Sequence, residues 1–232
     1  MRKKTIITSI ISIIIIAAFV TGMVVFGPWT NKVKQLEGVE VIEYKGENLS
    51  SINDFRENSI KGPQQVDISA YRLQITGLAE NPANYTYDEV ISDFSKYEKV
   101  VRLNCVEGWA VNLLWEGVQV KDILEKAGPL PEAKVVIFHA YDGYTTSFPI
   151  EYIVNNNILM AYKMNNVTIP PERGFPFQLV AESKWGYKWI KWITQIELSD
   201  NTSYKGYWEE RGYSNEGDLN GSFFEFGNPF DF

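Results

Sequence analysis

A long uncharged segment near the amino terminus divides this sequence into two unlike parts. After the basic start "MRKK", no charged residue occurs from Thr5 to Phe26, and most positions are apolar. An apolar run of this length can cross a bilayer as a helix, and basic residues before it favour a cytoplasmic amino end. The pattern predicts a single-pass anchor within residues 1–28, with the folded part on the extracytoplasmic side of the cell membrane. A cleaved signal peptide is the alternative, although its apolar core is usually shorter and no clear A-x-A site follows.

The chain of 232 residues contains one cysteine, Cys105, and one histidine, His139. One cysteine cannot form an intramolecular disulfide, so an exported domain of this composition must be stable through its core alone. The same counts exclude a cysteine-rich zinc site, a cysteine-ligated iron–sulfur cluster and a bis-histidine haem. The formal net charge is -7, and no patch rich in Lys and Arg is evident, so nucleic acid is not an expected partner.

The remaining sequence predicts one α+β domain dominated by strands, with short helices. Aromatic residues make up 14% of the chain, and such side chains suit half-buried pleated surfaces. Strands are expected within 66–77, 99–105, 133–150 (two strands around the turn Asp142–Gly143), 158–165, 175–183 and 189–200. Helices are expected within 80–94 and 118–128, the latter closed by Gly128. The predicted organisation is a tether and an arm over 29–61, the domain over 62–200, and an acidic, aromatic tail over 201–232.

Cys105 lies where a predicted strand ends, with Gly108 shortly after it. The local pattern leaves three interpretations open: a buried apolar cysteine, a thiolate ligand for a metal, or a nucleophile paired with His139. Arg102 would lower the pKa of the thiol if it pointed the same way, but an odd separation on a strand points two side chains to opposite faces. The neighbouring residues alone do not decide between the three.

Two longer motifs resemble the sulfite oxidase superfamily, and in particular the branch of the molybdenum-dependent protein-methionine-sulfoxide reductase catalytic subunits. The first is a Cys-Val-Glu-x-Trp run followed by Trp-x-Gly, which extends here from Cys105 to Gly117. The second is a Pro-Pro-x-x-Gly-x-Pro turn followed by an aromatic-Gly-aromatic-Lys-x-x-Lys run, which extends from Pro170 to Lys191. A weaker match is "RENSIKGPQ", so the resemblance spans the chain from about Arg56 to Asp200.

The resemblance implies the molybdopterin-binding fold of that superfamily and a molybdenum–molybdopterin cofactor of the single-pterin type. Cys105 would be the metal-ligating and catalytic thiolate, a soft ligand that suits such a metal. Trp109 and Tyr187 are candidate catalytic residues that wall the substrate pocket. Cationic groups are needed near the pterin phosphate, because burial of an unpaired dianion is costly. The residues that the resemblance places at the cofactor are Arg56, Asn58, Cys105, Ala140, Arg173, Gln178, Lys188, Trp189, Ile190 and Lys191.

Three positions depart from the pattern of the reductase branch. That branch has asparagine where this chain has Arg173, arginine where it has Gln178, and threonine where it has Ala140. Either Arg173 replaces the missing phosphate contact or the phosphate is held differently, and the pattern leaves both open. Ala140 is carried over by backbone position only. The "VEGW" segment also lacks the anion-binding arginine that sulfite oxidases carry after their cysteine, which makes sulfite the less favoured substrate.

The resemblance implies oxygen-atom transfer, in the direction of reducing an S-oxide or N-oxide that is either a small molecule or protein-bound, such as methionine sulfoxide. Because the chain has ligands for neither haem nor iron–sulfur clusters, the electrons would come from a separate membrane subunit linked to haem or quinol. Two alternatives stay open. One is an enzyme that oxidises sulfite, and the other is a cofactor-free extracellular binding module on the same fold.

Overall fold

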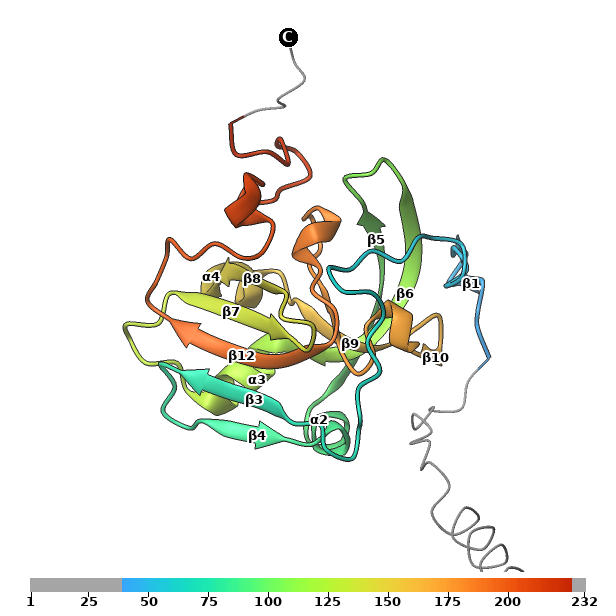
Figure 1. Ribbon diagram of the computed structural model, residues 1–232. Helices are drawn as coiled ribbons and strands as arrows, with labels where there is room; N and C mark the ends of the chain where they lie inside the picture. The colour runs from blue at the N-terminus through green and yellow to red at the C-terminus, as the bar shows by residue number, and fades with distance from the viewer. Residues whose placement is uncertain (1–38, 227–232) are drawn as a thin grey trace, which may run out of the picture. The chain divides into compact units, whose positions relative to one another are not determined.

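Two five-stranded β-sheets organise the part of the chain that this computed structural model describes, residues 39–226 (Figure 1). In spatial order, the first sheet consists of β4 (Ala83–Tyr85), β3 (Leu73–Gly77), β12 (Ile193–Ser199), β7 (Val135–Ala140) and β8 (Thr145–Pro149). The second sheet runs through β10 (Val167–Thr168), β9 (Leu159–Met164), β6 (Ala110–Gln119) and β5 (Lys96–Asn104), with β11 (Gln178–Val180) also paired to β9. The structure thus confirms the expected α+β class in which strands dominate.

The predicted membrane anchor lies outside the described residues. Among residues 39–226, no helix is both long and apolar enough to cross a bilayer. The described chain begins with a two-stranded ribbon of β1 (Glu43–Tyr44) and β2 (Glu47–Asn48). The arm, defined here as residues 50–62, then runs without helix or strand toward the first sheet. The Ser50 amide donates to the carbonyl of Asn112 at 2.8 Å, which attaches the start of the arm to β6.

The β12 strand occupies the centre of the first sheet. It pairs parallel with β3 and antiparallel with β7, and its side chains at Ile196 and Leu198 are buried. Strands β7 and β8 form the hairpin that the sequence predicts around Asp142 and Gly143. The carboxylate of Asp142 accepts a hydrogen bond from the Tyr144 amide at 2.9 Å, which is the local interaction that favours aspartate in turns.

The β6 strand is the longest element that the sequence pattern did not reveal among residues 39–226. Its last seven residues, 113–119, are all buried. A strand covered on both faces loses the alternation of apolar and polar residues that marks a half-exposed strand. Gly117 allows β9 to approach closely, since a Cβ atom there would lie 2.3 Å from the carbonyl oxygen of Met160. The pairing of β6 with β9 shifts register at this same point, between Glu116 and Gly117.

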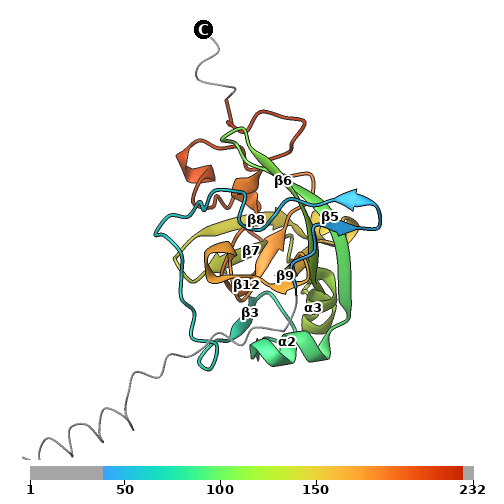
Figure 2. The same cartoon turned by 90° about the vertical axis from the view of Figure 1, so that its right-hand side faces the viewer.

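The helices are short, as predicted. Helix α2 (Tyr87–Asp93) begins with a capping box between Thr86 and Glu89, and α4 is Ile150–Asn155. Helix α3 (Val120–Ala127) ends where predicted, at Gly128 with a φ of +65°, but begins two residues later than the predicted Val118 because β6 extends to Gln119. Figure 2 shows the β5–β6 hairpin as a long curved ribbon, with α2 and α3 near its lower end.

The segment before β12 differs from its prediction in a way that affects the site. The strand expected over 189–200 begins only at Ile193, and the residues before it form the 3-10 turn η2 (Gly186–Lys188) and a loop. Trp192 takes a φ of +53°, which interrupts an extended conformation. Two further 3-10 turns are η1 (Pro171–Arg173) and, in the tail, η3 (Glu209–Arg211). The loop before β12 therefore has no strand conformation, although the carbonyl of Ile190 accepts a hydrogen bond from the Leu179 amide of β11 at 2.9 Å.

Candidate functional site

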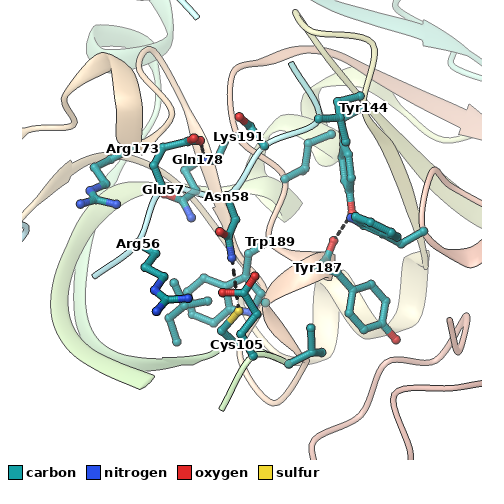
Figure 3. Close-up of a pocket in the computed structure, with 18 of the residues that line it drawn as sticks. Arg56, Glu57, Asn58, Cys105, Tyr144, Arg173, Gln178, Tyr187, Trp189 and Lys191 are labelled. Carbon is teal, nitrogen blue, oxygen red and sulfur yellow. Dashed lines mark hydrogen bonds and ion pairs between the residues drawn. The ribbon is translucent and has the colours of Figure 1, made fainter. Parts of the chain in front are cut away.

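A cavity of about 420 Å³ lies between stretches of chain that are far apart in the sequence. Its lining comes from the arm, the β5–β6 loop, the β7–β8 turn, the segment between η1 and β12, and the tail. The predicted site residues that it brings together, most of them labelled in Figure 3, are Arg56, Asn58, Cys105, Trp109, Arg173, Gln178, Tyr187, Trp189, Ile190 and Lys191.

Cys105 is the first residue of the loop that joins β5 to β6. Its amide donates to the carbonyl of Trp109 at 2.9 Å, and the amide of Gly108 donates to the carbonyl of Cys105 at 3.1 Å. Gly108 has a φ of +85°, a conformation that glycine adopts without strain. The sulfur accepts a hydrogen bond from the side-chain amide of Asn58 at 3.6 Å (Figure 3). This tight loop presents one buried sulfur atom to the cavity.

The surroundings of Cys105 do not prepare the thiol as a nucleophile. Burial raises its pKa above the ordinary value, and the hydrogen bond from the Glu107 amide opposes that rise. His139 lies outside the lining of the cavity, and its Nε2 atom pairs with Glu197 Oε2 at 2.8 Å. The structure therefore does not assemble the cysteine–histidine pair that the sequence left open. A bound metal is the kind of cation that favours the thiolate form.

Lys191 contributes a partly buried cation to the cavity. Its Nζ atom forms an ion pair with Glu57 Oε1 of the arm at 2.6 Å. Burial lowers the pKa of the Lys191 ammonium group, while Glu57 acts in the opposite direction. The stem of the lysine packs on Gly174, where a Cβ atom would lie 3.0 Å from Lys191 Cβ and Cγ. The ammonium group is thus held in place, and its partner is the carboxylate of a residue that also lines the cavity.

Arg173 lines the cavity, but its hydrogen bonds within residues 39–226 connect it to the arm. Its Nε atom donates to the carbonyl of Ile52 at 3.0 Å, and its Nη2 atom donates to the carbonyl of Phe55 at 2.7 Å. The guanidinium group also lies 3.8 Å from the centroid of the Phe55 ring. The sequence predicted a phosphate contact for this residue. That contact stays a prediction, and the geometry in addition supports a role in fixing the arm, which carries Glu57 and Asn58 into the site.

Replacement of Arg173 with methionine is expected to loosen the arm. The variant loses two hydrogen bonds from a charged donor, so we expect a loss of about 2 kcal/mol in the free energy of unfolding, measured by urea denaturation. Amide exchange in residues 52–58 should become faster. Arg173→Lys is the matched control, because it keeps the charge but cannot span both carbonyls, and it should behave like Arg173→Met. Unchanged exchange in Arg173→Met would contradict this role.

Lys188 and Ala140 are the two predicted cofactor contacts that the structure places outside the lining of the cavity. Lys188 is fully buried, and its ammonium group is used by Glu209 at 2.7 Å and by two backbone carbonyls. Ala140 lies at the end of β7, where its amide donates to Tyr144 and its carbonyl accepts from Gly143. The ammonium group of Lys188 is thus committed to a buried acidic partner in the tail, which is not visible in the local sequence.

The tail supplies residues that sequence reasoning missed. Trp208 and Tyr213, named here the tail wall, line the cavity and pack against each other with ring centroids 5.1 Å apart. The Tyr213 hydroxyl has no hydrogen-bond partner among residues 39–226. Elsewhere in the lining, Trp109 packs against Phe55 with ring centroids 5.7 Å apart. The Tyr187 hydroxyl donates to the carbonyl of Ser214 at 2.7 Å. Tyr187, a predicted wall of the substrate pocket, therefore uses its hydroxyl to bind the tail.

The residues of the cavity fit a pterin-bound metal. Within residues 39–226, no group of three or more His, Cys, Asp and Glu side chains could hold a metal ion, so a metal here needs ligands from a cofactor beside Cys105. Among the described residues, the Ser59 hydroxyl is buried without a partner and the Gln178 side-chain amide has none either, so both are available to a polar ligand. Gly186 approaches closely, since a Cβ atom there would lie 3.5 Å from the Cα atom of Cys105.

The cavity combines one buried sulfur, a cation held by Glu57 and polar groups without partners among residues 39–226, and this set suits a metal that is carried by an organic cofactor. The chain belongs to the family described as the oxidoreductase molybdopterin binding domain, which matches residues 60–208. It is accordingly a molybdenum-dependent oxidoreductase of the sulfite oxidase superfamily, and its cofactor is molybdenum–molybdopterin.

Curated relatives agree with this assignment. The uncharacterized oxidoreductase YuiH of Bacillus subtilis is 35% identical over 67% of this chain and 78% of its own length. The putative protein-methionine-sulfoxide reductase subunit YedZ1 of Azospira oryzae is 32% identical over 65% of this chain and 57% of its own length. The catalytic subunit MsrP of Xanthomonas campestris pv. campestris is 27% identical over 66% and 54%. This chain thus spans little more than half of the latter two.

A solved structure shows the same fold. The sulfane dehydrogenase SoxCD from Paracoccus pantotrophus superposes with a TM-score of 0.57 at 24% identity, covering 60% of this chain and 41% of that one. At this level of identity the likeness supports the fold, and the assignment to the family rests on the sequence matches above.

Proposed function

We propose that this protein is an exported, membrane-anchored oxidoreductase that reduces an S-oxide or N-oxide, with methionine sulfoxide in proteins as the favoured substrate. The observation that carries the proposal is the position of the Cys105 sulfur in a cavity walled by aromatic side chains. Relatives named as protein-methionine-sulfoxide reductase subunits match the same part of the chain, which supports this choice.

Aromatic walls of the cavity suit a neutral oxide, and two cations in its lining, Arg56 and Lys191, are left for the anionic pterin phosphate. Aromatic rings make favourable contacts with sulfur-containing alkyl groups, and Trp109, Phe55 and Trp208 provide such rings. The guanidinium group of Arg173 is already bonded to arm carbonyls. The Glu107 carboxylate, which accepts a hydrogen bond from Trp109 at 3.1 Å, would repel sulfite. We therefore favour a sulfoxide over sulfite as the substrate.

Reduction of a sulfoxide consumes two electrons and two protons and yields the thioether and one water molecule. When bound, the molybdenum group supplies the two-electron redox chemistry and the oxygen-atom transfer. Cys105 binds the metal, and Lys191 and Gln178, with backbone groups of the loop before β12, hold the pterin. The Tyr213 hydroxyl, which has no acceptor among residues 39–226, donates a hydrogen bond to the oxygen of the substrate and so orients it.

The electrons come, in this proposal, from a separate membrane protein that carries haem or oxidises quinol. The chain has one cysteine, too few for an iron–sulfur cluster besides the metal, and its one histidine, His139, pairs with Glu197 at 2.8 Å. The uncharged segment from Thr5 to Phe26 supports anchoring beside such a partner, with the catalytic domain outside the cytoplasm.

Metal analysis of the full chain, purified in detergent from a host that makes molybdopterin, tests the proposal. We expect close to one molybdenum and one pterin per chain. We also expect a reduced viologen dye to be oxidised when a peptide containing methionine sulfoxide is added, with no comparable electron release from sulfite. Protein from a host that cannot make molybdopterin is the control. Metal-free protein from the competent host would instead support a binding module, and faster turnover with sulfite would reverse the direction.

A further inference from the structure

A buried ion pair joins the tail to the loop that leads into the cavity. Lys188 and Glu209 are 0% and 1% exposed, and the Nζ and Oε1 atoms are 2.7 Å apart. The ammonium group also donates to the carbonyls of Ser147 at 2.9 Å and Asn215 at 3.0 Å, so all three of its protons are used. The Glu209 Oε1 atom accepts a second bond, from the Thr146 hydroxyl at 2.8 Å.

Stability alone does not require this pair. Removing two charges from water is costly, and apolar residues of similar volume can often replace a buried ion pair without loss. One carboxylate oxygen, Glu209 Oε2, even remains without a hydrogen-bond partner, at the site where a Cβ atom on Gly206 would lie 2.8 Å away. The pair is costly to bury, and further hydrogen bonds hold both of its partners. We take this as a sign that the loop before β12 and the tail need one defined arrangement.

The two partners stand directly beside cavity residues. Lys188 ends η2 and is followed by Trp189, which lines the cavity, as do Ile190 and Lys191. Glu209 begins η3 and is preceded by Trp208 of the tail wall. The ion pair therefore connects the loop on one side of the cavity to the tail wall on another, from outside the cavity.

Further contacts link the same two segments. Tyr187 and Tyr213 pack edge to face with centroids 5.0 Å apart. The amide of Tyr213 donates to the carbonyl of Trp208 at 3.2 Å, which closes η3 into a compact turn. Gly217 packs so closely on Lys188 that a Cβ atom there would lie 2.6 Å from Lys188 Cγ. The tail thus packs tightly against the side chain of the buried Lys188.

We propose that Lys188 and Glu209 are positioning residues that fix the tail wall, Trp208 and Tyr213, in front of Cys105 and so set the shape of the substrate pocket. For its activity readout this inference rests on the proposed function. The pair contacts neither the cofactor nor the substrate, because it lies outside the cavity. It acts through the tail wall, and its loss should affect substrate binding while leaving the metal in place.

The test compares Glu209→Gln, Lys188→Met and the double variant Lys188→Met/Glu209→Gln. Each single change leaves a partner buried without its counter-charge, so the double variant is expected to regain most of the lost melting temperature. Loss of a charge-assisted bond should speed amide exchange at Glu210, Gly212 and Tyr213 by about 10- to 100-fold in all three variants. KM for the sulfoxide peptide should rise about tenfold, with a smaller change in kcat and unchanged molybdenum content.

The matched control is Lys205→Met, which breaks an exposed ion pair of the tail with Glu225 at 2.6 Å. It should alter neither amide exchange nor KM. A double variant whose KM and exchange return to wild-type values together with its melting temperature would overturn the proposal, since the pair would then be only structural. Exchange is measured whether or not the protein reduces sulfoxides, so a failure of the proposed function is distinguished from a failure of this inference.

Discussion

Replacement of Cys105 with serine is expected to remove molybdenum from the purified protein while leaving the domain folded. Changes to residues that merely orient a metal ligand weaken binding about 10- to 100-fold, and loss of the ligand itself should cost at least that much. The hydroxyl of serine is a harder and more weakly acidic ligand than a thiol, so it does not replace a thiolate. Metal analysis should show a loss of at least about tenfold, and dye oxidation should fall to background.

The fold should tolerate this change because Cys105 lies in a loop and Asn58 can donate to the new hydroxyl as it does to the sulfur. We expect the free energy of unfolding to fall by about 1 kcal/mol, as for burial of one bonded hydroxyl. Cys105→Ala is the matched control, which should lose metal equally without a new polar atom. Normal molybdenum content in either variant would exclude Cys105 as the metal ligand.

Turn and helix-end residues predicted the parts of the fold whose conformation depends only on neighbouring residues. The glycine at 128 ends α3, and the Asp142–Gly143 pair turns β7 into β8. Strand β6 could not be found in the same way, because its residues are buried by both neighbours and by the core and therefore do not alternate. The end of β6 also contains Val118 and Gln119, which fit the periodicity of the helix that follows.

The site residues also fall into a group that the sequence predicted and a group that it did not. Motif spacing predicted the residues that line the cavity from the β5–β6 loop and the loop before β12, such as Cys105 and Lys191. It did not predict the contribution of the tail wall or the true partners of Lys188 and Arg173. Those partners are a buried carboxylate 21 residues further along the chain and two arm carbonyls more than 100 residues away. Contacts of this range follow from the packing of the whole domain and leave no periodic trace in the sequence.

Replacement of Lys191 with methionine is expected to weaken retention of the pterin. A charge-assisted hydrogen bond contributes about 1.5–3 kcal/mol, which corresponds to about 10- to 100-fold in affinity. Methionine retains the stem that packs on Gly174 but removes the cation, and it leaves the Glu57 carboxylate without its partner. That carboxylate would then repel a phosphate dianion, which adds to the loss. The pterin that remains after prolonged dialysis, measured by fluorescence after oxidation, reports the effect.

Two comparisons separate the loss of charge from a general disturbance of the loop. Lys191→Arg keeps a cation and should retain most of the pterin, and Glu57→Gln removes the competing carboxylate and should retain at least as much as the wild type. The folded double variant Lys188→Met/Glu209→Gln removes the other lysine of the same loop, whose ammonium group is directed to Glu209 and away from the cavity. Equal loss of pterin from this variant and from Lys191→Met would show that the phosphate contact does not depend on Lys191.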